Sequence, residues 1–137
     1  MPIYMKYEGV NGDMTGKYRG WIELESVQLG VIRANSSTDR ERKPEQPRVS
    51  EIVITKLQDI ASSALFRESL NGKGKKVIID FVRAEDDTQY LRIELENVLI
   101  SSFSVSGHGG PGSSPMESLS LNFAKITYTT TASAPVK

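Results

Sequence analysis

The apolar residues of this chain alternate at period two in three long segments, and in each segment the alternation changes parity midway. Alternation at period two is the pattern of a β-strand with one buried face. A strand whose apolar set moves to the other parity contains a bulge or passes from one sheet face to another at a bend. The change of parity occurs from Ile22 and Leu24 to Val27, Leu29 and Val31, from Leu91, Ile93 and Leu95 to Val98 and Ile100, and from Leu119, Leu121 and Phe123 to Ile126 and Tyr128.

Three such strands predict a strongly coiled sheet that closes on itself. Residues 50–56 and 75–83 are rich in Val and Ile, and the second run is almost continuously apolar, which predicts a central strand. Apolar residues at helical spacing over 58–70 predict one α-helix, with Asp59 as its N-cap and Gly72 at its C-terminal end. The predicted fold is mainly β, a small closed β-barrel of two tightly packed sheets, with one flanking α-helix that covers an edge.

The length of the chain fits one domain. It has 137 residues, of which 38% are hydrophobic, enough for one core and too few for two ordinary ones. We assign residues 1–130 to this domain. Residues 131–137 are predicted to be a flexible C-terminal tail.

The charge and residue usage exclude several classes of function. Lys plus Arg and Asp plus Glu each total 17, so no overall field would attract nucleic acid or an anionic membrane. The absence of cysteine removes disulfides, thiolate metal sites and cysteine nucleophiles, and a single histidine leaves little for zinc. No apolar stretch approaches the ~18 to 20 residues that span a bilayer, and no signal peptide is recognisable. These features predict a cytoplasmic protein without membrane insertion, and they leave open export by a machine that accepts a folded protein.

The loop around His108 matches G-x-G-x-x-G over residues 107–112. A dinucleotide site needs a helix after the glycines and an acidic residue about 20 positions further on. A strand pattern follows instead, and no Asp or Glu occurs after Glu117. Catalysis by His108 with a nearby serine would need an orienting carboxylate and an oxyanion hole. We therefore interpret the loop as a wide hairpin connection, in which His108 is either an exposed loop residue or a contact at an interface or lumen.

Other candidate sites have structural explanations. Residues 72–76 include three lysines and two glycines, but a phosphate loop needs a helix downstream, whereas here the helix lies upstream. The acidic run 85–87 lacks the spacing of a calcium loop and predicts a turn. Asp80, inside an apolar strand, is expected either to face a polar lumen or to pair with a Lys or Arg. Trp21 is expected in the core or at a subunit contact.

Residues 33–48 form a segment without apolar periodicity that contains two prolines and eight charged residues. Compact domains seldom contain so long a loop unless it is functional or disordered. Across the whole chain no set of convergent groups suited to catalysis is recognisable. The sequence therefore favours a structural or binding role over an enzyme.

Two parts of the chain resemble a known protein family. The first is the segment 98–126, with V-L-I-S-S, S-G-H-G-G and E-S-L-S-L-N-F-A-K-I in that order. The second is Thr55, Lys56 and Asp59 at the start of the helix. With these residues the chain, from Ile3 to Thr130, resembles the haemolysin-coregulated protein family, Hcp, the tube-forming component of bacterial type VI secretion systems.

The resemblance implies a β-barrel with one helix, assembled into hexameric rings with an open channel. Rings would stack into a tube, driven by a contractile sheath and tipped by a VgrG-type spike protein, and small effector proteins would travel in the channel. It implies a protein that is cytoplasmic before firing and then secreted, without a signal peptide. Gln28 and His108 are the expected channel-facing residues. The ring-stacking contacts are expected in the long loop, at Arg40, Glu41, Arg42 and Lys43.

Family variants with enzyme activity carry an extra catalytic domain, and this sequence ends soon after its final strand. We therefore expect no enzyme activity, no cofactor and no catalytic or metal site. The alternative function is a monomeric β-barrel module that binds a small ligand or carbohydrate, followed by an enzyme built around His108.

Overall fold

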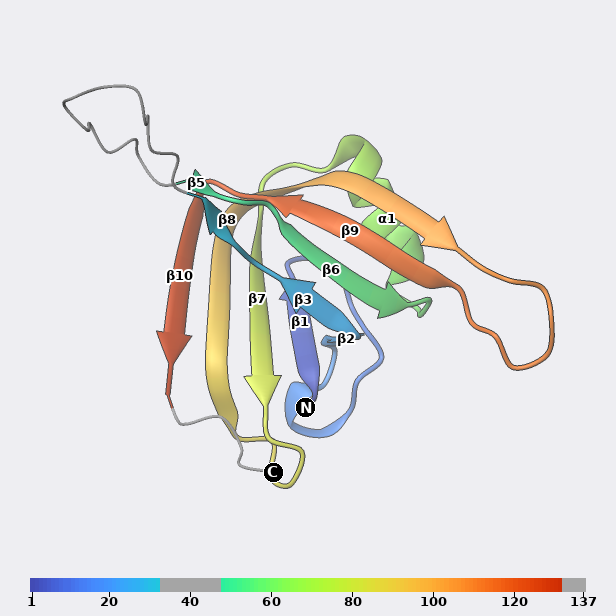
Figure 1. Cartoon of the computed structure of the whole chain (residues 1–137), viewed down its shortest axis with the longest axis horizontal. Helices are drawn as coiled ribbons and strands as arrows, with labels where there is room; N and C mark the ends of the chain where they lie inside the picture. The colour runs from blue at the N-terminus through green and yellow to red at the C-terminus, as the bar shows by residue number, and fades with distance from the viewer. Residues whose placement is uncertain (33–47, 132–137) are drawn as a thin grey trace, which may run out of the picture.

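The computed structural model describes residues 1–32 and 48–131. Within these ranges the chain forms ten β-strands, one α-helix and one turn of 3-10 helix (Figure 1). The elements in chain order are β1 (Ile3–Tyr7), η1 (Gly16–Tyr18), β2 (Ile22–Leu24), β3 (Ser26–Gln28), β4 (Val31–Ile32), β5 (Arg48–Val49), β6 (Ile52–Leu57), α1 (Ser62–Asn71), β7 (Lys75–Val82), β8 (Gln89–Ser106), β9 (Met116–Asn122) and β10 (Lys125–Thr130).

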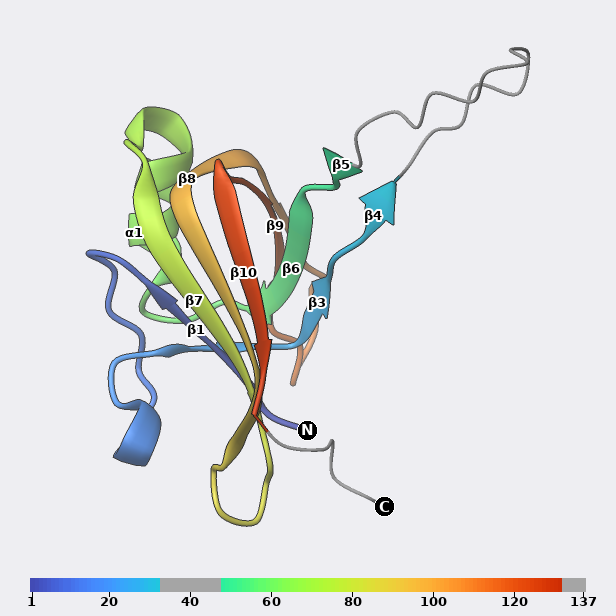
Figure 2. The same cartoon turned by 90° about the vertical axis from the view of Figure 1, so that its left-hand side faces the viewer.

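The strands form two antiparallel sheets that share the long strand β8. The first sheet has the order β2, β1, β7, first half of β8, β10. The second sheet has the order second half of β8, β9, β6, β3. A separate ribbon of β4 and β5 stands away from both sheets (Figure 2). As predicted, the apolar run in β7 is a central strand, because β1 and β8 pair with its two edges.

The three changes of parity are the corners where chain segments pass from one sheet to the other. The segment 22–28 pairs with β1 through β2 and, after Glu25, with β6 through β3. Strand β8 leaves β7 after Val98 and pairs with β9 from Leu99 onward. Strands β9 and β10 are separated only by residues 123–124 and run antiparallel to β8 along both of its halves. The sequence prediction of a bend between sheet faces is therefore confirmed at all three places.

Strand β8 bends at a defined backbone feature. Asn97, at its midpoint, has a positive φ of 57°, which is uncommon outside glycine. The ladder with β9 also shifts register between Ile100 and Ser102, as a β-bulge does. A Cβ atom on Gly74 would lie 1.7 Å from the side-chain oxygen of Asn97, so a larger residue there would have to displace that side chain at the bend.

The prediction of a closed barrel is not confirmed, because the described strands leave the sheet order open at β2 and β3. These two strands are successive parts of one extended segment, so they follow each other end to end and do not pair side by side. The predicted composition, mainly β with two sheets and one helix, is confirmed. The architecture is a two-sheet sandwich with shared corner strands.

The main core lies between the two sheets. The second sheet contributes Ile54 and Leu119, and the first contributes Ile79 and Leu95, all completely buried. Burial of such a side chain stabilises the fold by roughly 1.5–3 kcal/mol. The alternation that predicted the strands therefore arises from one shared core.

The helix begins later than predicted. It spans Ser62–Asn71, and Ala61 occupies the N-cap position. Asp59 still serves the helix start, because its carboxylate accepts a hydrogen bond from the Ala61 N–H at 2.9 Å. Ile60 was expected on the apolar stripe and is instead exposed in the preceding turn. Gly72 ends the helix as predicted, with its N–H bonded to the Glu68 carbonyl.

Both predicted connections between strands are present. The acidic run 85–87 forms the turn between β7 and β8, with a hydrogen bond from the Arg83 N–H to the Thr88 carbonyl. The loop around His108 joins β8 to β9, as the hairpin interpretation required. His108 itself is exposed.

The buried Tyr7 hydroxyl makes the stability of the fold depend on pH in the alkaline range. The residue is buried in the main cluster, and this burial, with a smaller effect of the Glu68 carboxylate, raises the pKa of Tyr7 from 10.0 to about 12. An unfolded chain loses this proton near pH 10, whereas the folded chain keeps it until about pH 12. The contribution of Tyr7 to stability is complete below pH 10 and is lost as the pH rises from 10 toward 12.

We expect Tyr7→Phe to lose less stability than the wild type over that interval, because Phe has no proton to release. The measurement is the melting temperature as a function of pH, followed by circular dichroism. Tyr128→Phe is the matched control, since Tyr128 is exposed. An identical alkaline slope for Tyr7→Phe and the wild type would contradict the assignment.

Candidate assembly surface

A fully buried ammonium group lies where the helix meets the second sheet. Lys56 has no exposed surface, and four oxygen atoms surround its Nζ atom. They belong to the Glu117 carboxylate at 2.8 Å, the Asp59 carboxylate at 2.9 Å, the Leu57 carbonyl at 2.9 Å and the Ser62 hydroxyl at 3.2 Å. A buried charge is tolerated only when it is paired and hydrogen-bonded in this way.

This ionic cluster connects three elements of the fold. Lys56 lies on β6, Glu117 lies opposite it on β9, and Ser62 is the first residue of α1. The Ser62 hydroxyl also donates to the Glu117 carboxylate at 2.9 Å. The cluster therefore holds the helix start against one end of the second sheet.

A second buried cluster answers the question that the sequence left open for Asp80. Its carboxylate receives a bidentate ion pair from Arg92, at 2.7 and 2.8 Å, and a hydrogen bond from the Tyr18 hydroxyl at 2.9 Å. Burial, followed by this bond to Asp80, raises the pKa of Tyr18. Tyr18 and Trp21 pack edge to face, and both belong to a small apolar cluster with Tyr4. The cluster fixes the segment before β2 on the outer face of the first sheet.

The solvent-facing side of the second sheet carries no charged residue at its strand positions. Its inner positions, such as Ile52, Ile54 and Leu119, face the core, so the alternate positions face outward. These outward positions are Ser26, Gln28, Val53, Thr55, Leu57, Leu99, Ser102, Ser104, Ser106, Met116, Ser118, Ser120 and Asn122.

Hydroxyl groups dominate this face, which we call the hydroxyl face. The Ser26 and Thr55 hydroxyls are bonded across β3 and β6, and the Ser102 hydroxyl donates to that of Ser120 at 2.9 Å across β8 and β9. Glu51 contributes a carboxylate only at the border, just before β6, where Ser101 donates to it. Exposed surfaces usually carry charged side chains, which keep a protein soluble. This face has none at its positions on four strands, so we expect it to have another role.

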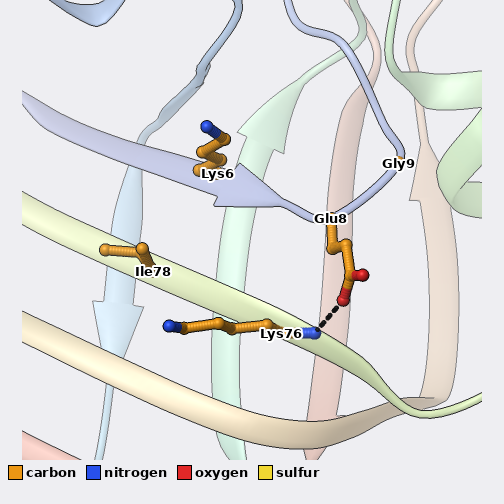
Figure 3. A pocket seen from close by; sticks show the side chains of 5 residues that line it. All are labelled: Lys6, Glu8, Gly9, Lys76 and Ile78. Atoms are coloured by element: carbon orange, nitrogen blue, oxygen red, sulfur yellow. Dashed lines mark hydrogen bonds between the residues drawn. The ribbon is translucent and has the colours of Figure 1, made fainter.

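The outer face of the first sheet has the opposite character. A hollow of about 400 Å³ on this face is lined by Lys6, Glu8, Gly9, Lys76 and Ile78 (Figure 3). The Glu8 carboxylate accepts a hydrogen bond from the backbone N–H of Lys76 at 2.9 Å. A neighbouring hollow of about 140 Å³ shares Lys76 and is lined also by Glu94, Glu96, Lys125 and Thr127. This face mixes charges of both signs.

The second sheet ends in two strands with unpaired edges. Strand β3 pairs only with β6, and the second half of β8 pairs only with β9, among the residues that the structure describes. Each outer edge presents backbone N–H and C=O groups without a strand partner, which favours pairing with another chain. The two edges lie at opposite ends of the same sheet, so each is free to meet a different edge of a neighbouring copy.

The structure describes the positions of two of the predicted site residues, Gln28 and His108. Gln28 lies on β3 and is exposed on the hydroxyl face. His108 lies in the exposed β8–β9 loop, where Ser113 donates a hydrogen bond to its backbone carbonyl at 2.8 Å. A channel exists only in an assembly, so a channel-facing role for either residue stays a prediction. Arg40, Glu41, Arg42 and Lys43 lie outside the described residues.

Sequence reasoning missed both the ionic cluster and the hydroxyl face. Lys56 shares the parity of the core residues Ile52 and Ile54, a signal that its side chain is buried. The hydroxyl face is visible as serines alternating with apolar residues over 116–122. Neither signal shows which groups meet, because the partners come from distant strands.

Two negative findings apply to the described ranges 1–32 and 48–131. Within them, no group of three or more His, Cys, Asp or Glu residues is arranged to hold a metal ion. In the same part of the chain, no helix has the length and apolar character needed to cross a membrane.

Comparison with known proteins identifies the class to which this fold belongs. Residues 4–129 match the family described as type VI secretion system effector, Hcp. The chain therefore belongs to the Hcp family, the tube proteins of type VI secretion systems. None of the curated proteins matches this chain.

Solved structures share the fold at low sequence identity. One described as a type six secretion system protein has a TM-score of 0.85 at 22% identity, over 93% of this chain and 82% of that one. Hcp1 from Salmonella typhimurium has a TM-score of 0.79 at 21% identity, over 95% and 87%. A type VI secretion system effector from Yersinia pestis has a TM-score of 0.74 at 22% identity, over 93% and 88%.

We expect Lys56→Met to lose roughly 3–5 kcal/mol of unfolding free energy, because it leaves the Glu117 carboxylate buried without its cation. The double variant Lys56→Met with Glu117→Met should recover part of this loss, since it removes that charge. The control is Lys125→Met, whose ion pair with Glu96 is exposed and should contribute no more than about 1 kcal/mol. Urea titrations at matched protein concentration measure all three, and equal losses for Lys56→Met and Lys125→Met would contradict this role.

Proposed function

We propose that this protein is the structural subunit of a type VI secretion inner tube. In this proposal six copies form a ring, rings stack into a tube, the tube is secreted, and small effectors travel in its channel. The observation that supports it most is the second sheet, which combines an uncharged hydroxyl face with unpaired edges at both ends. Membership of the Hcp family supports the same role.

Ring formation would use the two different free edges. The edge of β3 on one copy and the edge of β8 on the next would pair in a heterologous contact, and rotation about a common axis closes the ring. Each contact would extend the second sheet into the neighbouring copy. The number six comes from the family resemblance.

A channel lined by the hydroxyl face would suit passage of cargo. Any charge on a subunit is repeated in every copy of a ring, and fields focus inside narrow channels. A lining without charged strand positions avoids such a field, so cargo of either sign could enter and leave. Gln28 would lie on this lining, and His108 would lie in the loop at one of its ends.

Stacking is assigned to the long loop 33–48, whose charged residues Arg40, Glu41, Arg42 and Lys43 would pair across rings. Each exposed ion pair contributes only ~0 to 1 kcal/mol, which suits a tube that must assemble and come apart. The further partners in this proposal are a VgrG-type spike and a contractile sheath. The protein would be cytoplasmic before firing and extracellular, or in a target cell, afterwards.

One observation favours a second function. The hollow between Lys6, Glu8 and Lys76 is large enough for a small polar ligand (Figure 3). A monomeric ligand-binding module would use this charged face and would have no need of the hydroxyl face or the free edges. The oligomeric state separates the two functions.

We expect the purified protein to sediment as a ring of six copies and to appear as annular particles in electron micrographs. The physical reason is that two complementary edges on each copy permit closure. Sedimentation velocity across a range of concentrations, with negative-stain microscopy, makes the measurement. A stable monomer at high concentration, without annular particles, would refute the tube function and favour the ligand-binding module.

Deletion of residues 40–47 should shorten or abolish stacks while single rings persist, because the free edges that close the ring lie outside the deleted segment. Particle lengths in side views provide the measurement. A replacement of the same segment by an equally long Gly-Ser linker controls for loop length. Loss of the rings themselves would show that the loop takes part in closure.

A further inference from the structure

Four apolar side chains, three of them exposed, lie beside the free edge of β8, and we call this surface the apolar shoulder. Phe66 and Leu70 lie one helical turn apart on α1, and Phe103 and Val105 lie on the same side of β8. Phe66 packs edge to face on Phe103, with ring centroids 5.5 Å apart. Phe66, Leu70 and Val105 are 49%, 65% and 61% exposed. The helix and the second half of β8 lie together in Figure 1.

A second exposed apolar surface adjoins the other free edge. The chain leaves β3 and enters the β4–β5 ribbon, where Val31 and Ile32 are each 64% exposed and Val49 is 38% exposed. Val31 has the same parity as Val27 and Leu29, which pack against the core. The Ser50 side chain holds this exit in place through hydrogen bonds with the backbone of Gly30 at 2.8 and 3.0 Å. The ribbon stands away from the body of the protein, so its apolar side chains are available to a partner (Figure 2).

These two surfaces are placed so that they would meet in a ring. The shoulder borders the β8 edge, and the ribbon continues from the β3 edge, the two edges at opposite ends of one sheet. Across β6 and β9 the ladders place Gln28 level with Ser102, so the ribbon that follows β3 emerges toward the Leu99 end of β8. The C-terminal end of α1, with Leu70, lies on that side, because the next strand, β7, begins with Lys75 opposite Val98. Where the β3 edge of one copy lies beside the β8 edge of the next in the same register, the ribbon would therefore come to the Leu70 end of the neighbouring shoulder. Both surfaces carry exposed apolar side chains, next to Arg48 in the ribbon and Arg67 on the helix, and no segment among residues 1–32 and 48–131 covers them.

We propose that the apolar shoulder of one copy binds the β4–β5 ribbon of a second copy, with Val31 and Ile32 against Phe66 and Leu70. This inference rests on the proposed ring, and it names the apolar contact that accompanies strand pairing. Strand edges alone would pair with many sequences. An apolar contact beside the edge selects a second copy of this chain and sets the direction of assembly.

The test uses charged substitutions on one surface at a time. Phe66→Asp and Val31→Asp each place a carboxylate on an exposed apolar position, so both variants should fold, which circular dichroism verifies. Each alone should weaken ring formation by ~tenfold or more, as truncation of a central interface residue does. Arg67→Asp, at the next exposed helix position, and Val31→Ile, which remains apolar, are the matched controls and should form rings like the wild type.

A mixture of the two charged variants gives the sharpest result. The Phe66→Asp copy keeps an intact ribbon, and the Val31→Asp copy keeps an intact shoulder, so one native contact joins them. Both remaining surfaces of that pair carry a charge, and growth stops at a 1:1 dimer. Native mass spectrometry should find this dimer in the mixture and in neither variant alone.

The other outcomes overturn the inference in distinguishable ways. Wild-type rings together with rings from both charged variants would reject the contact and leave the proposed function standing. If only Phe66→Asp loses its rings, the ribbon is not the occupant of the shoulder. The same conclusion holds if both variants are folded monomers and their mixture contains no dimer. A wild type that forms no rings would reject the proposed function itself.

Discussion

The buried ammonium group of Lys56 is the interaction on which the rest of the structure depends. Its charge is neutralised by Glu117 on the neighbouring strand and by Asp59 before the helix. A pairing of this kind is weak evidence for net stability, but loss of one partner leaves a buried charge and is costly. The cluster therefore specifies one register of β6 against β9 and one position for the helix start. Through that position it also places Phe66 and Leu70 beside the edge of β8.

The register that Lys56 specifies separates two kinds of surface on the second sheet. A slip of one residue would turn every side chain to the opposite face, and the serines of β9 would enter the core. In the observed register Leu119 is buried, and the intervening serines, Ser118 and Ser120, face outward. The first sheet is held in a comparable way by Asp80 and Arg92. Its outer face has charges of both signs, as an ordinary solvent-exposed surface does.

The corners explain why the edges of the second sheet remain free. Because three segments cross between the sheets, each sheet takes only part of each long strand, and the second sheet ends at the short β3 and the second half of β8. Isolated proteins usually protect such edges with charges, bulges or covering segments. Here β8 has a bulge between Ile100 and Ser102, but serines and apolar residues otherwise border the edges. This arrangement is unfavourable for a monomer and is the arrangement that a self-associating subunit requires.

Much of the fold was predictable from local pattern, because period-two alternation and its changes of parity depend only on which neighbours face a core. They predicted the strands of the two sheets, the central position of β7, the three corners and the hairpin around His108, but not the β4–β5 ribbon. The predicted start of the helix was wrong, since Ile60 matched the helical spacing without being buried. The predicted closure of the barrel is not confirmed, since the pattern could not show that β2 and β3 follow each other end to end. The tertiary structure alone decided that Lys56 meets Glu117 and that Phe66 meets Phe103. These contacts join residues distant in the chain, and their geometry is set by the packing of both sheets around one core.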